Sequence, residues 1–251
     1  MKYDENIIVD LHNKQMNYVF FKYSHKCNIA GFSLAEVLIT LAIIGIIAAM
    51  TIPGLIANTN DQELKTAWKK AYSDISQATL LIMADNGGTM TNLCSTFDNN
   101  CFRDLYSNYL NYTKICDVNA TYGTCFHSLN GSWQFDTVKL LNGTSNIQVN
   151  AYYPLSASGD SGARLNNGQL LLFDYRSSTC TDTTHVEGYT NACGWITVDV
   201  NGFKGPNTVG KDIFTVDILI TKTTPTGTGN LSNTCIPSST GQGCGAKYLY
   251  E

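Results

Sequence analysis

The chain contains one long apolar stretch, GFSLAEVLITLAIIGIIAAMTIP, at residues 31–53. From Leu34 to Ile52 its only charged residue is Glu36. A helix through this run would rise roughly 30 Å, which is the thickness of the hydrocarbon core of a bilayer. The stretch therefore predicts a membrane-spanning helix.

The same stretch resembles the N-terminal region of type IV pilins and of the pseudopilins of type II secretion. Precursors of that family carry a polar leader that ends in Gly. An aromatic or aliphatic residue follows, and a Glu stands at the fifth position of the mature chain. Gly31, Phe32 and Glu36 occupy these places with the right spacing. Gly45 and Pro53 also fall where the family commonly has a Gly and a helix-loosening Pro.

The resemblance implies a specific maturation route. A prepilin peptidase and methyltransferase would remove residues 1–31 and methylate the new amine of Phe32. Glu36 would then compensate the amine of a neighbouring subunit during assembly. Other pilin subunits and the inner membrane are the implied partners. The implied location is the inner (cytoplasmic) membrane, with a single pass and the C-terminal domain outside the cytoplasm, and a pilus or pseudopilus after assembly.

Other N-terminal signals fit the sequence less well. An ordinary secretory signal has an apolar region of about 7–15 residues and then a small-residue cleavage site, whereas this run is longer and carries an acid. A plain single-pass anchor is the second alternative. A lipoprotein signal is disfavoured because no apolar lipobox precedes Cys27. The leader is long for a pilin, and translation from Met16 would give an ordinary length with Lys22 and Lys26 as its charges, which favours a cytoplasmic N-terminus.

After Pro53 the apolar positions become periodic, with steps of three and four residues. This spacing predicts an amphipathic helix that packs on another element. The stripe consists of Leu64, Trp68, Ala71, Tyr72, Ile75, Ala78, Thr79 and Ile82. Asn86-Gly87-Gly88 predicts the helix end. Residues 32–53 and 54–86 would form one helix of roughly 80 Å, with a bend or a melted turn at Pro53 because proline lacks a backbone donor.

The remaining residues, 87–251, form the predicted extracytoplasmic globular domain. Charged residues are 14% of the chain and the net charge is −4, so the composition shows no nucleic-acid footprint. There are nine cysteines, and all but Cys27 follow the helix. An even number behind a membrane signal indicates an oxidising compartment, although free thiols are the alternative. A zinc site is not favoured, because the sequence contains no C-x-x-C motif.

Eight cysteines allow 105 pairings, and nearest-neighbour pairing is our default because they fall along the chain in four close couples. The predicted disulfides are Cys94–Cys101, Cys116–Cys125, Cys180–Cys193 and Cys235–Cys244.

The domain contains several strand signals and one short helical signal near residues 102–110. No helical pattern interrupts the strand signals, so an antiparallel sheet is predicted. The predicted strands are 133–141, 147–153, 163–165, 169–175, 195–200 and 213–221. The first two flank Asn142-Gly143, and the next two flank a hairpin-type turn at residues 166–168. We therefore predict an α+β, pilin-like fold: a long N-terminal helix packed on an antiparallel β-sheet that disulfides staple.

Two segments of the domain contain residue types that could carry chemistry. Gly159-Asp160-Ser161-Gly162 resembles the nucleophile turn of trypsin-like proteases, but His127 lacks the sequence context of that family and no enzyme is predicted. The loop from residue 199 to 212 is rich in Gly and in oxygen ligands, which suits calcium at Asp199, Asn201 and Asp212. The competing reading is a long turn held by Asx hydrogen bonds.

Two functions from different classes remain. The first is a structural subunit of a type IV pilus-like filament, with a type II secretion pseudopilin or a competence pilin as variants of it. The second is a membrane-tethered binding domain that does not polymerise. Glu36 favours a filament, because an ionised carboxylate in a bilayer costs up to roughly 2.5–3.5 kcal/mol and a mere tether has no use for it.

Overall fold

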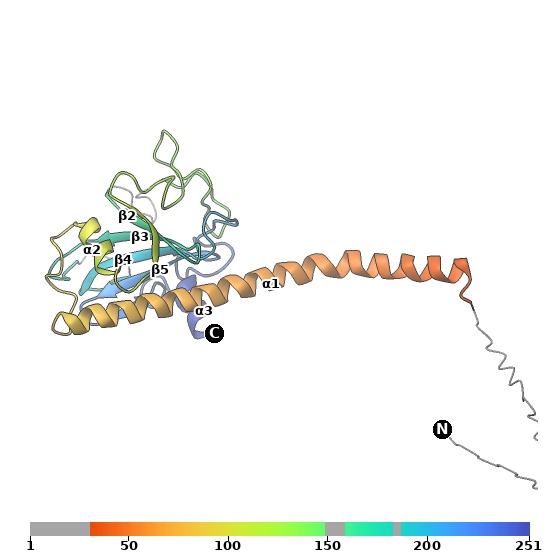
Figure 1. Cartoon of the computed structure of the whole chain (residues 1–251), viewed down its shortest axis with the longest axis horizontal. Helices are drawn as coiled ribbons and strands as arrows, with labels where there is room; N and C mark the ends of the chain where they lie inside the picture. Colours follow the sequence, from red (N-terminus) through yellow and green to blue (C-terminus); the bar gives the residue numbers. More distant parts are fainter. Residues whose placement is uncertain (1–30, 149–158, 183–186) are drawn as a thin grey trace, which may run out of the picture. The chain divides into compact units, whose positions relative to one another are not determined.

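The computed structural model describes residues 31–148, 159–182 and 187–251. The predicted leader, residues 1–30, lies outside them. The chain divides between Met50 and Thr51 into two compact units. Its elements, shown in Figure 1, are α1 (Leu34–Asp85), α2 (Asn99–Leu105), β1 (Tyr112–Cys116), β2 (Ser161–Leu165), β3 (Leu170–Tyr175), β4 (Ala192–Asp199), β5 (Ile213–Leu219), β6 (Thr223–Pro225) and α3 (Cys244–Tyr250).

The helix α1 has the predicted extent to within two residues at its start and one at its end. Its C-terminus is closed by Gly88, whose backbone N–H donates to the carbonyl of Met83 at 2.7 Å. Gly87 and Gly88 both have positive φ, at 74° and 88°, which glycine adopts without steric cost. Pro53 lies inside α1 and the helix continues past it, so the expected melted turn does not occur. A bend at Pro53 stays a prediction.

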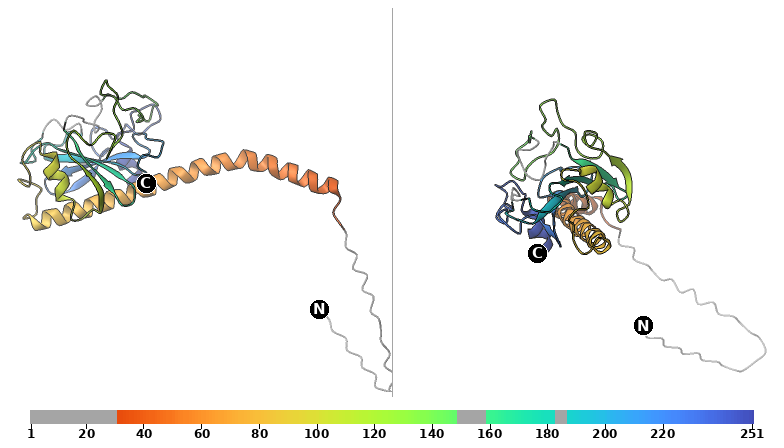
Figure 2. Two further views of the ribbon diagram at one scale, coloured as in Figure 1. Left: turned by 45° about the horizontal axis from the view of Figure 1, so that its top comes forward. Right: turned by 90° about the vertical axis from the view of Figure 1, so that its left-hand side faces the viewer.

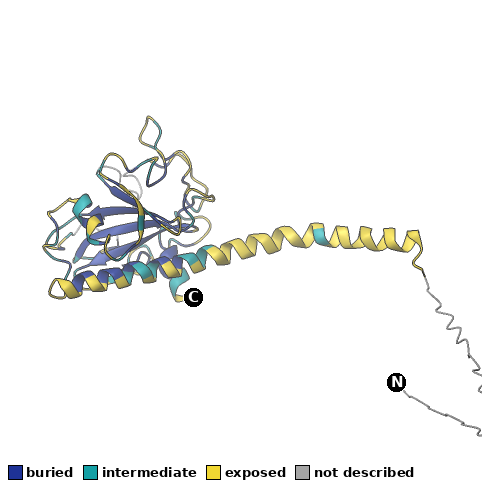
Figure 3. Cartoon of the chain, in the orientation of Figure 1, coloured by how far each residue is buried: buried dark blue, intermediate teal, exposed yellow. Residues whose placement is uncertain are grey.

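In the first unit, the described residues are helical from Leu34 onward. Between residues 31 and 50 every side chain is exposed except that of Ala48, which is half-buried (Figure 3). The exposed side chains include bulky apolar ones such as Leu38, Ile44 and Met50. Within residues 31–50, the described part of this unit, nothing covers this apolar surface.

The second unit is built on one antiparallel sheet of six strands in the order β1-β2-β3-β4-β5-β6. Each strand therefore pairs with its neighbours in sequence. The β2–β3 hairpin turns at residues 166–168 as predicted, with Gly168 at φ +89° and its N–H donating to Leu165. The central pairing is longest between β4 and β5, from Ala192↔Leu219 to Asp199↔Ile213.

One face of this sheet packs against the second half of α1, over residues 64–83 (Figures 1 and 2). The buried residues of α1 follow the predicted stripe: Trp68, Ala71, Ile75, Ala78, Thr79, Ile82 and Met83. Trp68 is fully buried, stacks on Phe214 of β5 with 4.7 Å between ring centroids, and donates its Nε1–H to Gly245 of α3 at 2.9 Å. The amphipathic pattern therefore specifies this contact.

The opposite face of the sheet carries a second core. Leu170, Leu172 and Ile213 point to this side, while Leu171 and Phe173 point to α1, as the two-residue period of a strand requires. Irregular chain supplies the cover, and its buried apolar residues are Phe126, Phe135, Val138, Leu140, Ile147 and Val209. Both faces of the sheet are therefore buried, whereas the sequence predicted a cover, the helix, for one face only.

The predicted strand at residues 133–141 is wrong. Asn130 Oδ1 accepts the N–H groups of Ser132 and Gln134 at 2.9 and 3.0 Å, and Trp133 has φ +57°, so the chain turns where a strand would begin. Only isolated bridges occur there, such as Gln134↔Gln148. The expected strand 147–153 is described only as far as residue 148, and its remainder lies outside the described residues.

The remaining differences lie at the edges of the sheet. The short helix forms earlier than predicted, at Asn99–Leu105, because Asp98 caps it by accepting the N–H of Cys101 at 3.0 Å. The strands β1 and β6 and the helix α3 were not predicted. The first of these strands is an exposed edge of the sheet, with a weak alternation in its sequence.

Candidate processing and assembly site

The bond between Gly31 and Phe32 lies in exposed, non-helical chain just before α1. Phe32 is 86% exposed, and no atom lies within 4 Å of the place where a Cβ of Gly31 would stand. A peptidase must bind an extended backbone on both sides of the bond that it cuts. Residues 31–33, the described part of this segment, are non-helical and exposed, so they are accessible to a peptidase.

Ser33 and Glu36 form a reciprocal cap on the first turn of α1. The backbone N–H of Ser33 and its hydroxyl donate to Glu36 Oε2 at 2.8 and 2.9 Å. In return, the N–H of Glu36 donates to Ser33 Oγ at 3.2 Å. This is a capping box, and the S-x-x-E spacing of Ser33 and Glu36 in the sequence is its signature.

The cap leaves Glu36 with one free acceptor. Among the described residues, no hydrogen bond reaches its Oε1. The local cap therefore uses one carboxylate oxygen, Oε2, and leaves the other without a hydrogen bond among the described residues. A cationic group from another chain can bind at that oxygen without displacing Ser33.

The apolar part of α1 follows directly after this cap. It is the one helix in the described chain that is long and apolar enough to cross a membrane, by length and composition. Gly45 lies within it with open space around its Cβ position, so another helix can approach its backbone closely. Cap, processing bond and apolar helix are contiguous in the first unit.

The four disulfides join the same pairs that the sequence predicts: Cys94–Cys101, Cys116–Cys125, Cys180–Cys193 and Cys235–Cys244. They tie irregular chain to regular elements. Cys193 lies in β4, Cys116 ends β1, and Cys244 begins α3. The disulfides therefore hold the peripheral elements to the sheet.

The serine of the protease-like tetrapeptide is not a nucleophile. Ser161 is fully buried in β2, and its hydroxyl donates to the backbone carbonyl of Asn99 at 2.5 Å. His127 instead contacts Asp199 through Nε2 at 2.8 Å and Thr137 through Nδ1 at 3.3 Å. The histidine and the serine thus have separate partners, and the described residues hold no nucleophile–base pair between them.

The loop from residue 199 to 212 brings its two acidic ends together. Burial, and then the nearby charge of Asp199, raise the pKa of Asp212 to about 6. Burial likewise raises the pKa of Asp199, and the hydrogen bond with His127 opposes this shift. Both carboxylates are occupied: Asp199 Oδ1 accepts the N–H of Asn201 at 3.1 Å, and Asp212 accepts those of Asn207 and Thr208 at 2.7 and 2.6 Å.

These bonds are the Asx-type turn that competes with a calcium site. The side-chain carbonyl oxygens of Asn201 and Asn207 are buried without a hydrogen-bond partner in the described residues, which would suit a hard cation. However, Asp199 is already held by His127, and the described chain contains no cluster of three acidic, His or Cys side chains suited to a metal. Calcium at Asp199, Asn201 and Asp212 stays a prediction.

A comparison with protein families matches residues 26–52 to the prokaryotic N-terminal methylation motif. The matched region ends within the apolar part of α1 and includes Gly31, Phe32 and Glu36. Comparisons with curated proteins and with solved structures found no match.

The motif, the apolar helix and the disulfide-stapled antiparallel sheet support a prepilin of the type IV pilin and pseudopilin kind. Prepilin peptidases recognise this motif, which implies that the chain is a substrate of that class of enzyme. Members of this family are structural subunits and not enzymes. The helix and the motif fit anchoring in a membrane.

Proposed function

We propose that the chain is a structural subunit of a type IV pilus-like filament. It is made as a prepilin, cleaved between Gly31 and Phe32, and polymerised through the first half of α1. The observation that carries this proposal is the methylation motif at residues 26–52, which continues into a helix whose described apolar surface is exposed. In a filament, neighbouring copies of the helix would bury that surface.

Before assembly, the same helix would anchor the subunit in the inner membrane. The leader would face the cytoplasm and the disulfide-bonded domain would face outward, since disulfides persist in oxidising compartments. The segment from Leu34 to Ile52 has 19 residues, 15 of them apolar, and as a helix it is long enough to span the hydrocarbon core of a bilayer. Lipid before assembly and neighbouring helices after assembly would each cover the same exposed apolar surface.

Glu36 separates this function from a simple membrane tether. A carboxylate near the start of a membrane helix opposes insertion, by up to roughly 2.5–3.5 kcal/mol at the bilayer centre and less near the interface. The free Oε1 of Glu36 would accept the amine of Phe32 from a neighbouring subunit. The pair would neutralise both charges in a region of low dielectric constant.

Replacing Glu36 by Val tests this proposal. The variant should insert into the membrane as well as the wild type or better, while purified filaments lack it. Glu63→Val is a matched control because Glu63 is an exposed acid of the same helix outside the apolar segment. Normal incorporation of Glu36→Val, or equal loss of both variants, would contradict the pairing.

The filament to which the subunit belongs is a finer question. The same features suit a type II secretion pseudopilin or a competence pilin. Purifying surface filaments and measuring how many copies of this chain they contain distinguishes a major pilus subunit from a minor or pseudopilus subunit. A chain found only in membranes, cleaved but never in filaments, would favour the tethered binding domain.

A further inference from the structure

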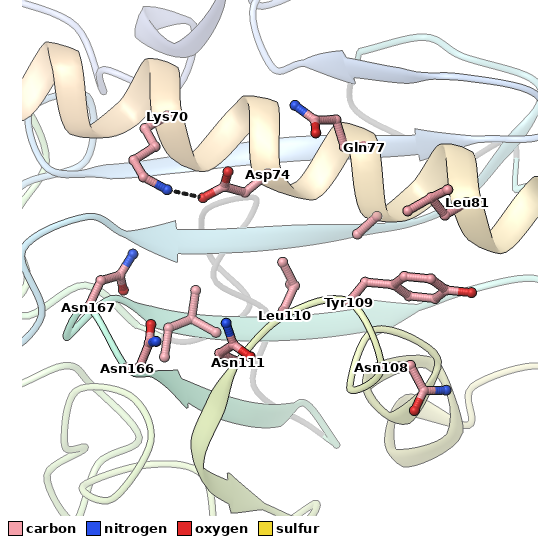
Figure 4. A pocket seen from close by; sticks show the side chains of 12 residues that line it. Lys70, Asp74, Gln77, Leu81, Asn108, Tyr109, Leu110, Asn111, Asn166 and Asn167 are labelled. Atoms are coloured by element: carbon pink, nitrogen blue, oxygen red, sulfur yellow. Dashed lines mark hydrogen bonds and ion pairs between the residues drawn. The ribbon is translucent and has the colours of Figure 1, made fainter.

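A groove of about 700 Å³ opens on the second unit (Figure 4). One wall is the sheet-packed half of α1, from Lys70 to Leu81. The other wall combines residues 108–111, which follow α2, with the β2–β3 turn at residues 165–167. We call this feature the amide groove, after the side chains of its second wall.

The second wall presents three side-chain amides with unused hydrogen-bonding capacity. Asn108, Asn111 and Asn166 are exposed, and within the described chain their side chains make no hydrogen bond. The backbone N–H of Asn166 donates to the carbonyl of Asn111 at 3.0 Å, so the two segments of this wall are fixed to each other. Each amide offers two donors and an acceptor to a ligand.

The groove carries no net charge. Its only charged residues are Lys70 and Asp74, which form an ion pair with 2.6 Å between Nζ and Oδ2. Figure 4 shows this pair on α1 opposite Asn166, Asn167 and Asn111. A phosphate, a polyanion or a metal cation would therefore find no uncompensated countercharge. The chemistry favours an uncharged polar ligand.

Apolar surface lies between these polar groups. Leu110 and Leu165 line the groove and are buried, and Leu81 is exposed on α1 near Tyr109. The hydroxyl of Tyr109 donates to Asp85 Oδ2 at 2.6 Å, which fixes the orientation of its half-buried ring. A fixed aromatic ring beside aliphatic side chains suits a ligand that has both C–H faces and hydroxyl edges.

We propose that the amide groove binds a neutral oligosaccharide. Sugar hydroxyls are both donors and acceptors, which matches the free amides, while the C–H faces of sugar rings pack on Tyr109 and the leucines. The usual peptide-binding features, such as an Arg cluster or a slot lined by several aromatic rings, are absent from these lining residues. The inference goes beyond the filament role and does not depend on it.

The test uses the full-length protein, labelled and purified in a zwitterionic detergent, because a detergent with a sugar headgroup would itself compete. The probe is an array of neutral, acidic and basic oligosaccharides, read at low and at high salt. We expect binding to neutral members that salt does not change, since the groove has no net charge. Binding confined to acidic members, and lost at high salt, would overturn the proposal.

Variants locate the binding. Asn108→Ala with Asn111→Ala should weaken it by about tenfold or more, because two ligand hydrogen bonds are lost. Asn233→Ala is the matched control, an exposed amide outside the groove. If the double alanine variant melts early, Asn108→Asp with Asn111→Asp keeps the side-chain shapes and removes the donors, and it should also weaken binding.

Three further results would overturn the proposal: no neutral oligosaccharide bound by the wild type, unchanged binding by the groove variants, or occupation of the groove by another subunit. A photo-crosslinking residue at position 111 detects the last case, since it would join two copies of the chain in filaments. If the groove variants assemble normally into filaments, a negative result for oligosaccharide binding leaves the proposed filament role unaffected.

Discussion

The hydroxyl and the backbone N–H of Ser33 both donate to one carboxylate oxygen of Glu36, at 2.9 and 2.8 Å, across the first turn of α1. Glu36, which we expected to act only between subunits, therefore also has a role within its own subunit, where it caps α1. The cap holds Glu36 through Oε2 and leaves Oε1 available for the contact with a neighbouring chain that we propose. Ser33 is thus a positioning residue for the assembly contact that we propose.

Ser33→Ala should reduce incorporation into filaments, but less than Glu36→Val does. Loss of an N-cap hydroxyl typically costs a helix about 1 kcal/mol, and here it also frees the Glu36 side chain. Ser33→Thr keeps the hydroxyl and should assemble normally. The measurement is the fraction of each variant in purified filaments relative to the membrane pool. Equal incorporation of the Ala and Thr variants would refute the positioning role.

Processing should produce a mature chain that begins at Phe32 with a methylated amine. The family motif at residues 26–52 and the exposed, non-helical residues 31–33 both support this cut. Mass spectrometry of the intact N-terminus after expression with a prepilin peptidase checks it. An uncleaved leader, or a cut after Ala49 or Ala57, would contradict the prepilin assignment.

The disulfide between Cys235 and Cys244 should stabilise the second unit by about 2–3 kcal/mol, as loop closure of this length does. Its loss would release the start of α3, whose Gly245 carbonyl accepts the indole N–H of Trp68. Thermal melting of Cys235→Ser with Cys244→Ser, against the wild type, measures the effect. Non-reducing peptide mapping of the wild type should show the four pairs, and free thiols or crossed links would speak against them.

Asp160 should make the stability of the second unit fall with rising pH. Burial, and then the neighbouring charge of Asp174, raise the pKa of Asp160 well above its ordinary value. Tyr122 donates to Asp160 at 2.9 Å, and Arg176 pairs with Asp174 at 3.0 Å. The folded state thus holds the proton more tightly than the unfolded chain does. This stabilisation is complete below the unfolded pKa near 4 and is lost as pH rises through the raised folded value.

Asp160→Asn copies the protonated acid and should remove this dependence. Its melting temperature should exceed that of the wild type at neutral pH, by about 2–4 °C for each kcal/mol, and should match it near pH 4. Asp61→Asn, at an exposed acid of α1, is the control and should change little. A constant difference between wild type and Asp160→Asn across the pH range would show that Asp160 is not the titrating group.

Calcium should not change the melting temperature of the full-length protein if the Asx-type turn is the whole role of the loop from residue 199 to 212. Asp199 pairs with His127, and Asp212 accepts two backbone amides, so neither carboxylate needs a cation. Melting with calcium and with chelator, for the wild type and for Asp199→Asn with Asp212→Asn, decides between the readings. A rise of several degrees that the double variant abolishes would establish the calcium site.

Several features could be predicted because they depend on residues close together in the chain. The apolar run and the change to a period of three and four residues specify both halves of α1, from the membrane-length segment to the stripe around Trp68 and Ile75. The β2–β3 hairpin follows from Asn166-Asn167-Gly168, because Gly adopts the positive φ that the turn needs. The processing and assembly residues likewise lie within a few positions of one another.

The sequence by itself determined the helix, its ends, the hairpin and the motif, since each rests on local propensity or on spacing within a few turns. Only the tertiary structure decided what covers the second face of the sheet, why residues 133–141 turn instead of forming a strand, and where His127 and Ser161 find their partners. It also brought Asn111 and Asn166 together in the amide groove. These outcomes depend on contacts between residues far apart in the chain, whose free energy exceeds local preference and leaves no periodic trace in the sequence.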